Sequence, residues 1–481
     1  MIDRTLTRRA LLASAAGATG ASLLAPAAFA SRKADVARPN IIFIMADDLG
    51  FADVSCYGRP DYETPHIDAL AAQGTRFMQA YANSAVCSAT RVGLITGRYQ
   101  NRLPIGLEEP LATRDVGLPP SHPTLPSLLR KIGYGTALIG KWHMGALPKY
   151  GPLKSGYEHF WGFRGGGLDY FTHQFMGKPD RWDDDRETEQ PGYLTDLIGQ
   201  HALEAIGRYA AKRQPFFLSV HFNAPHWPWE GPEDEAEAHR LAASKAPFAV
   251  FHTDGGSQKT YAEMVTRMDV QVGRITKALD ELGIADDTII IFTSDNGGER
   301  FAYTWPFTGK KTELLEGGLR IPAIIRWPGH IPAGAANEQV MISMDWLPTL
   351  LAIAGTAPAI AYPSDGMDLG GTLLRGAAPV TRTLCWRYLN LSQEACRDGD
   401  WKYLKILDNS FLFNVVEDPL ERANLKERHP DIYQRVLAKY RTWDATMLPL
   451  DPEASTSGFT GRDLADHFGI RNARTVAPPA D

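Results

Sequence analysis

Acidic and amide side chains follow two strongly apolar segments of the chain. Asp47 and Asp48 come directly after the apolar run Asn40–Met45, and Asp295 and Asn296 come directly after a second such run. Because the carboxyl ends of parallel strands meet at one edge of a sheet, we expect these four side chains to converge. A single aspartate at a strand end is more often a turn former or helix cap, but two such pairs favour a cation site. Oxygen ligands alone suit Ca²⁺ or Mg²⁺ better than zinc.

A cysteine precedes a predicted short helix. Cys87 stands at the amino end of the helical stretch Ser88–Ile95, which Gly97 is expected to end. Unpaired N–H groups and the helix dipole favour an anion at this position. The alternative interpretation is a buried cysteine that acts as a small apolar side chain. The sequence carries no local signature of a cysteine protease.

Basic side chains follow two further apolar runs. Lys141 and His143 come directly after Thr136–Gly140, and their spacing puts them on the same side of an extended chain. His226 follows the run Phe216–Phe222. An isolated histidine is more often structural, but the end of a strand is where a site in such a sheet is expected.

The apolar runs alternate with helical patterns, which predicts a doubly wound α/β sheet with parallel pairing. The expected strands are Asn40–Met45, Thr136–Gly140, Phe216–Phe222, Thr288–Thr293 and Pro322–Arg326. The expected helices are Ile67–Ala71, Leu125–Lys131, Asp196–Lys212 and Tyr261–Leu282.

The pattern changes after about residue 370, so we expect a main α/β domain over 31–370, a small α+β subdomain over 371–450 and a tail over 451–481. Within the subdomain, Cys385 and Cys396 are close enough in sequence to form a disulfide in an exported protein, and the sequence leaves this open. The expected antiparallel strands are Thr383–Leu389, Trp401–Leu407 and Ser410–Val415, followed by a helix over Pro430–Met447.

The composition of the chain excludes several classes of protein. Its 481 residues are 44% hydrophobic and carry a net charge of −6, which is unlike a disordered chain or a basic nucleic-acid-binding protein. Four cysteines are too few for a disulfide scaffold.

Residues 1–30 have early arginines, an apolar stretch and the ending Ala28-Phe29-Ala30, which predicts a signal peptide. Arg8-Arg9 favours the bacterial twin-arginine route to the periplasm over an ordinary secretory signal. No other stretch is long enough to span a membrane, so we expect no membrane partner.

Taken together, these segments resemble the sulfatase family (the formylglycine-dependent type), within the alkaline-phosphatase-like superfamily. They follow the family's order over nearly the whole mature chain and look closest to bacterial arylsulfatases and N-acetylgalactosamine-6-sulfatase-like enzymes. The resemblance implies a large mixed, mostly parallel sheet between helices, with a small C-terminal antiparallel sheet plus a helix. The main matching segments are Asn40–Gly50 (NIIFIMADDLG), Cys87–Arg98 (CSATRVGLITGR), Gly140–Gly145 (GKWHMG), Ala224–Pro228 (APHWP), Thr293–Gly298 (TSDNGG), Lys311–Pro322 (KTELLEGGLRIP) and Asp345–Thr349 (DWLPT).

The resemblance also implies a cofactor set and a role for each site residue. A maturation enzyme would convert Cys87 to formylglycine, whose hydrate is the nucleophile toward a sulfate ester. The implied ligands of Ca²⁺, with Mg²⁺ as the alternative, are Asp47, Asp48, Asp295, Asn296 and the modified residue 87.

Among the basic residues, Arg91 would hold the hydrate and His143 would assist its deprotonation. Lys141, His226 and a lysine before Glu316-Gly317-Gly318 would bind the sulfate, and His226 or that lysine would protonate the leaving oxygen. Counting back from Glu316 favours Lys311 over Lys310 for this lysine. Ala89 stands where the commonest family motif has proline, which leaves the maturation system open.

The substrate is the least determined property. The segment Tyr150–Gly192 has the position of a specificity loop, and Trp227 and Trp229 could stack on a sugar or aryl ring or belong to the core. The expected substrate is a sulfated small molecule or glycan. The alternatives are a phosphonate or phosphate ester hydrolase with the same nucleophile, and a non-catalytic protein that binds sulfated glycans.

Overall fold

A computed structural model describes residues 38–109, 111, 114–244, 249–461, 463–467 and 469. The predicted signal peptide, residues 1–30, lies outside the described residues. Within the described part of the chain, no helix is both long and apolar enough to cross a membrane.

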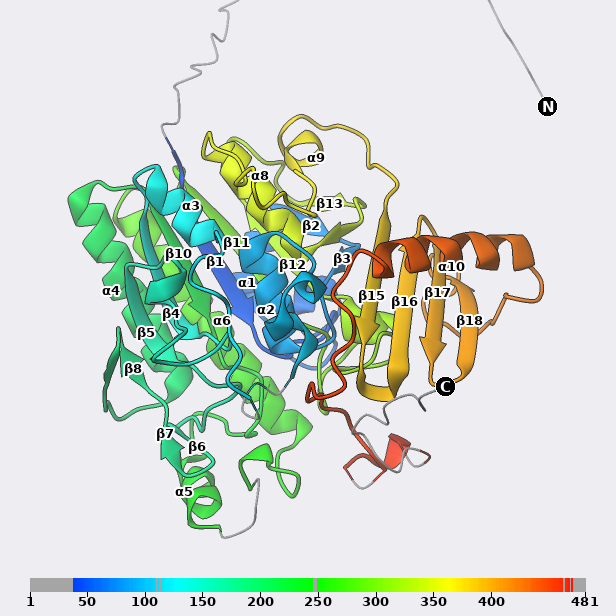
Figure 1. Cartoon of the computed structure of the whole chain (residues 1–481). Coiled ribbons are helices and arrows are strands. Elements are labelled where there is room, and N and C mark those ends of the chain that lie inside the picture. Colours follow the sequence, from blue (N-terminus) through cyan, green and yellow to red (C-terminus); the bar gives the residue numbers. More distant parts are fainter. Residues whose placement is uncertain are drawn as a thin grey trace, which may run out of the picture. The chain divides into compact units, whose positions relative to one another are not determined.

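A ten-stranded mixed sheet forms the centre of the fold (Figure 1). Its five central strands run parallel to one another, and their side chains are almost entirely buried. The sequence predicts four of them; the fifth, β5, lies within Tyr150–Gly192, for which the sequence predicts a specificity loop. In spatial order the strands are β13 (Ala335–Asn337), β2 (Thr75–Phe77), β12 (Ala323–Arg326), β11 (Thr288–Ser294), β1 (Asn40–Ala46), β10 (Phe216–His221), β4 (Gly135–Lys141), β5 (His159–Phe163), β8 (Trp182–Asp183) and β9 (Arg186–Glu187).

Strand β12 differs from the expected parallel pairing, because it runs antiparallel to β11. The connection from β11 to β12 does not cross over the sheet as a long helix. It folds back at the edge where β11 ends, and the N–H of Gly297 near its start donates to the carbonyl of Gly318 near its end over 3.0 Å. A chain that returns to the same edge must re-enter the sheet in the opposite direction.

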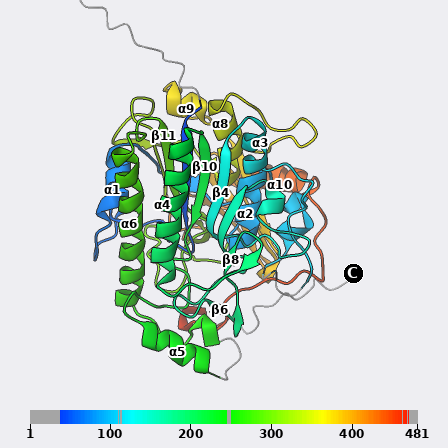
Figure 2. The ribbon, with the colours of Figure 1, turned by 90° about the vertical axis from the view of Figure 1, so that its left-hand side faces the viewer.

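Helices cover both faces of the sheet. On one face α4 (Leu194–Lys212) and α6 (Gln258–Glu281) lie side by side (Figure 2). Side chains of β1 alternate between the faces, so Ile42 and Ile44 pack with this helix pair while Phe43 contacts Trp346 on the other side. The remaining helices are α1 (Pro65–Ala72), α2 (Cys87–Thr96), α3 (Leu125–Lys131), α5 (Glu235–Ala243), α7 (Glu316–Leu319), α8 (Trp346–Ile353), α9 (Gly370–Leu374) and α10 (Pro430–Asp444).

The C-terminal part forms a separate antiparallel sheet against which α10 packs (Figure 1). Its strands are β15 (Thr383–Tyr388), β16 (Gln393–Asp398), β17 (Trp401–Ile406) and β18 (Asn409–Asn414). Of these, β16 was not predicted from the sequence, because polar and charged residues dominate it. Four two-residue strands complete the fold: β3 (Ala80–Tyr81), β14 (Met341–Ile342), β6 (Gln174–Phe175) and β7 (Lys178–Pro179).

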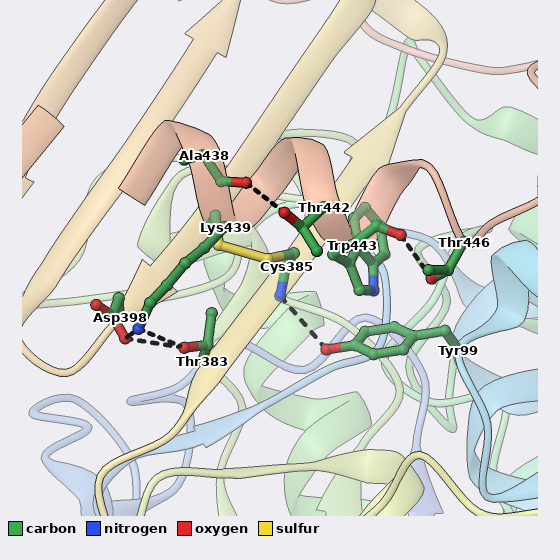
Figure 3. The surroundings of a disulfide bond; sticks show 10 residues. Tyr99, Thr383, Cys385, Asp398, Ala438, Lys439, Thr442, Trp443 and Thr446 are labelled. Atoms are coloured by element: carbon green, nitrogen blue, oxygen red, sulfur yellow. Dashed lines mark hydrogen bonds and ion pairs between the residues drawn. A yellow bond between two sulfur atoms is a disulfide. The ribbon is translucent and has the colours of Figure 1, made fainter. Parts of the chain in front are cut away.

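A disulfide joins the first two strands of this sheet. Cys385 and Cys396 are directly opposite each other in the β15–β16 ladder and are bonded. Figure 3 shows the bond beside α10, near Lys439 and Trp443. The question that the sequence leaves open is thus answered by the register of the two strands.

A buried ionic network connects the two sheets. Glu316, at the start of α7, accepts hydrogen bonds from the Tyr81 hydroxyl over 2.6 Å and from Arg320 Nε over 2.7 Å. Lys402 of β17 donates to Glu316 over 2.9 Å and lies 3.0 Å from Glu421. Both oxygens of Glu316 are therefore bound, and the C-terminal sheet supplies one of the partners.

We expect the substitution Lys402→Met to lower the free energy of unfolding by about 3–5 kcal/mol, because it leaves two buried carboxylates without their ammonium partner. Lys405→Met on the same strand is the matched control. Lys405 is half-buried and pairs with Glu394 at 2.9 Å, so its loss should cost at most about 1 kcal/mol. Urea unfolding followed by tryptophan fluorescence measures both, and equal effects would contradict a structural role for the network.

Candidate active site

The predicted site residues meet around one cavity at the carboxyl edge of the large sheet. The cavity has a volume of about 620 Å³, and its lining includes Cys87, His143, His226 and Lys311. These residues come from α2, from the segments after β4 and β10, and from the connection after β11. We refer to it as the active-site cavity.

Three carboxylates are buried together beside the active-site cavity. The register of β1 and β11 pairs Ala46 with Ser294, so Asp47 and Asp295 follow side by side. The backbone N–H of Asp48 donates to Asp295 Oδ1 over 3.2 Å. All three aspartates are fully buried. Burial and the neighbouring Asp295 raise the pKa of Asp47 to about 8.

Each carboxylate has a basic partner. Lys141 Nζ donates to Asp47, and Lys311 Nζ donates to Asp48 Oδ2 over 2.8 Å. Arg91 contacts Asp295 Oδ2 through Nη2 at 2.7 Å and through Nε at 3.1 Å. The three basic partners lie on β4, in the β11–β12 connection and on α2. Their ion pairs therefore hold three separate elements against the ends of β1 and β11.

The acidic residues can also hold a metal ion. One ligand atom each from Asp47, Asp48, Cys87 and His226 lies within 4.8 Å of the others. Asn296 donates its Nδ2 to Asp48 Oδ1 over 2.7 Å, while its Oδ1 is buried with no hydrogen-bond partner among the described residues. A buried oxygen without a donor costs free energy unless something binds it. The group of close ligand atoms thus contains a thiol and an imidazole beside two carboxylates, and Asp295 and Asn296 are not in it. The carboxylate and amide oxygens around it are the donors that suit a hard divalent cation.

Cys87 is the first residue of α2 and faces the carboxylates. The helix is buried along its whole length and ends at Gly97, whose φ of 66° is left-handed. Cys87 Sγ lies 3.3 Å from Asp47 Oδ1 and 3.8 Å from Asp48 Oδ1. Burial and the Asp47 carboxylate raise the pKa of the Cys87 thiol well above its usual range. A thiol in these surroundings stays protonated near neutral pH and is therefore a poor nucleophile.

Two histidines, His143 and His226, also line the active-site cavity. His226 Nε2 lies 3.6 Å from Asp48 Oδ2, and its Nδ1 is 2.8 Å from the carbonyl of Trp227, which makes Nδ1 the donor in the neutral ring. Glycines from the predicted specificity loop allow both rings to fit. A Cβ on Gly166 would come within 2.8 Å of His143, and one on Gly167 would come within 2.9 Å of His226.

Two glutamates that the sequence analysis missed also line the active-site cavity. Glu109 accepts a hydrogen bond from the N–H of Ser88 over 3.1 Å, and its Oε1 lies 3.6 Å from His143 Nε2. Glu299 is buried, and burial raises its pKa to about 7. Neither follows an apolar run directly, although Glu299 lies only three residues beyond Asn296 and could have been suspected on that ground.

The structure separates residues between which the sequence left a choice. Lys311 lies in the active-site cavity, whereas Lys310 Nζ pairs with Asp466 at 2.6 Å. Trp227 lines the cavity, whereas Trp229 is buried against Phe301 and belongs to the core.

Comparisons with known proteins agree with this architecture. The model of the family described as Sulfatase matches residues 39–356. Human N-acetylgalactosamine-6-sulfatase is 34% identical over 70% of this chain and 66% of its own length, and human arylsulfatase A is 32% identical over 81% and 79%. The crystal structure of Ps i-CgsB in complex with k-i-k-neocarrahexaose is similar with a TM-score of 0.77 and 31% identity, covering 86% of this chain and 94% of that one. Fold and sequence therefore agree that the chain belongs to the sulfatase family of sulfate ester hydrolases, within the alkaline-phosphatase-like superfamily.

Proposed function

We propose that this chain hydrolyses sulfate monoesters with residue 87 as the nucleophile, after conversion of Cys87 to formylglycine. The position of Cys87 carries the proposal, because its Sγ faces Asp47 and Asp48 in a cavity that also contains basic residues. One relative is named for N-acetylgalactosamine 6-sulfate and a similar structure holds k-i-k-neocarrahexaose. These two names support a sulfated glycan as the natural substrate, and the similarity to human arylsulfatase A supports an aryl sulfate as the alternative.

The proposed metal is Ca²⁺, with Mg²⁺ as the alternative. Asp47, Asp48, Asp295 and Asn296 would hold it together with the modified residue 87. The buried Oδ1 of Asn296, which no described residue satisfies, supports this assignment. When bound, the cation supplies charge that polarises a sulfate oxygen and favours the ionised hydroxyl of the hydrate.

The other site residues would bind the ester and move protons. Arg91 is one helical turn from residue 87 and would hold its hydrate. Lys141, His226 and Lys311 would bind sulfate oxygens, which requires both ammonium groups to turn from their present carboxylate partners. His143 would take a proton from the hydrate, and His226 Nε2 or Lys311 Nζ would give one to the leaving oxygen.

Export and maturation complete the proposal. Residues 1–30 would direct the chain to the bacterial periplasm by the twin-arginine route, and a formylglycine-generating enzyme would be an obligatory partner. A phosphonate or phosphate ester hydrolase remains the competing function. Faster cleavage of an aryl phosphonate than of the matched aryl sulfate would replace the sulfatase proposal by this one.

The tryptic peptide Phe77–Arg91 from protein made in its native host should carry the mass loss of thiol-to-aldehyde conversion at Cys87. The peptide that contains Cys56 is the internal control and should keep an intact thiol. An active preparation in which Cys87 is wholly unconverted would refute the proposed nucleophile.

Removal of bound metal with a chelator should abolish hydrolysis of 4-nitrophenyl sulfate, and Ca²⁺ should restore it. Because a ligand that binds only the native state stabilises it, Ca²⁺ should also raise the melting temperature. Asn296→Ala should weaken this stabilisation, whereas Asn409→Ala, on an exposed strand residue, should not change it. If neither Ca²⁺ nor Mg²⁺ changes the melting temperature of the wild type, the metal assignment is wrong.

Neighbouring lysines provide a matched test of sulfate binding. Lys311→Met should lower kcat/KM by about 100- to 1000-fold, because it removes a buried donor for the transition-state charge. Lys310→Met removes an equal charge whose partner is Asp466 on the surface, so it should change kcat/KM by no more than about threefold. Steady-state kinetics of the two variants show which lysine binds the sulfate. A larger loss of kcat/KM in Lys310→Met than in Lys311→Met would assign that role to Lys310.

A further inference from the structure

We propose that Arg164 and Glu299 form a sugar-binding subsite in the wall of the active-site cavity, which recognises hydroxyl groups of the saccharide that carries the sulfate. The inference rests on the proposed function and extends it to the part of the substrate beyond the ester. Both side chains line the active-site cavity, and both have buried hydrogen-bonding atoms that no described residue satisfies.

The Arg164 side chain is held by several contacts, yet two of its donor atoms have no acceptor in the part of the chain that the structure describes. Its guanidinium lies 4.1 Å from the centre of the Trp182 ring, and Nη2 donates to Asp185 Oδ1 over 2.7 Å and to the Asp184 carbonyl over 2.9 Å. Nε and Nη1 are buried without a hydrogen-bond partner among the described residues. Since Arg164 is only 5% exposed, bulk water does not readily accept hydrogen bonds from these two donors.

The surroundings of Arg164 favour a neutral acceptor over a second anion. Asp185 already forms an ion pair with the guanidinium. Asp180 also lines the active-site cavity, and it accepts hydrogen bonds from Trp182 Nε1 over 2.7 Å and from the N–H of Gly165 over 2.6 Å. A carboxylate or a second sulfate on the substrate would meet both negative groups, whereas a hydroxyl oxygen would not.

The subsite is near the proposed reaction centre. Arg164 lies two residues before Gly166, the glycine against which His143 packs. The α-carbons of Arg164 and Gly166 are therefore at most about 7 Å apart. Glu299 follows Asn296 by three residues in the β11–β12 connection. Both residues line the same cavity as Cys87, so a saccharide bound there can lie between them.

Glu299 supplies the complementary hydrogen-bonding capacity. It is 2% exposed, and neither carboxylate oxygen has a hydrogen-bond partner among the described residues, its nearest cation being Arg300 Nη2 at 3.6 Å. A hydroxyl both donates and accepts a hydrogen bond, so a polyol can satisfy Arg164 and Glu299 together. An aryl ring satisfies neither and leaves buried polar groups unpaired, which strongly disfavours binding.

The test compares sugar and aryl sulfates on matched variants. The probes are 4-nitrophenyl sulfate and the 6-sulfates of galactose, glucose and N-acetylgalactosamine. Arg164→Met and Glu299→Gln should each lower kcat/KM for the best sugar sulfate about 10- to 100-fold, the effect of losing a charged hydrogen bond. The loss on 4-nitrophenyl sulfate should be at least tenfold smaller, and most of the loss should be in KM. Arg267→Met removes an arginine paired with Asp196 on the outer helices and should leave both activities unchanged.

Other outcomes would overturn the subsite. Equal losses on sugar and aryl sulfates would place both groups in the chemical step. Calorimetry with Cys87→Ala protein separates this inference from the proposed function, because it needs no turnover. Sugar sulfate binding that is weakened by Arg164→Met supports the subsite even if the wild type hydrolyses no sulfate ester. If the wild type hydrolyses 4-nitrophenyl sulfate but neither binds nor hydrolyses the sugar sulfates, the subsite is refuted while the proposed function stands.

Discussion

The burial of three carboxylates at two adjacent strand ends is the constraint on which the site depends. Asp47, Asp48 and Asp295 follow β1 and β11, and burying them without partners would cost far more than a fold of this size can offset. Lys141, Lys311 and Arg91 provide those partners from three different elements. The same ion pairs that make burial of the acids tolerable thus bring together the basic groups that a tetrahedral oxyanion requires.

Much of the central architecture could be predicted from the sequence because its strands are buried on both faces. Such strands read as continuous apolar runs, and β1, β4, β10 and β11 begin and end within one or two residues of the expected positions. The convergence of the site residues followed from the rule that ligands bind beyond the carboxyl ends of parallel strands. Strand β16 gave no such signal, because Ala395 and Cys396 are its only apolar residues and polar or charged residues flank them on both sides.

The unpredicted parts of the site depend on tertiary contacts that have no local pattern. Glu109 reaches His143 only because its segment lies against the start of α2, where Ser88 binds it. The choice between Lys310 and Lys311 depends on how the β11–β12 connection folds back, and the sequence favoured Lys311 through a family spacing rather than a physical argument. The core position of Trp229 likewise depends on packing against Phe301, a residue about seventy positions later.

The ionic network between the sheets has a consequence for the order in which the molecule assembles. Glu316 directly follows the segment that carries Lys311. Its side chain binds Lys402, and its backbone N–H donates to Glu421 Oε2 over 2.6 Å; both partners are among the last hundred residues of the chain. During synthesis the loop with Lys311 can already be held by Tyr81, Arg320 and Asp48, because these partners precede the C-terminal strands in the chain. The two charged partners from the C-terminal part are added last, so a chain that stops before residue 402 would keep the sheet but leave Glu316 with fewer groups to hold it.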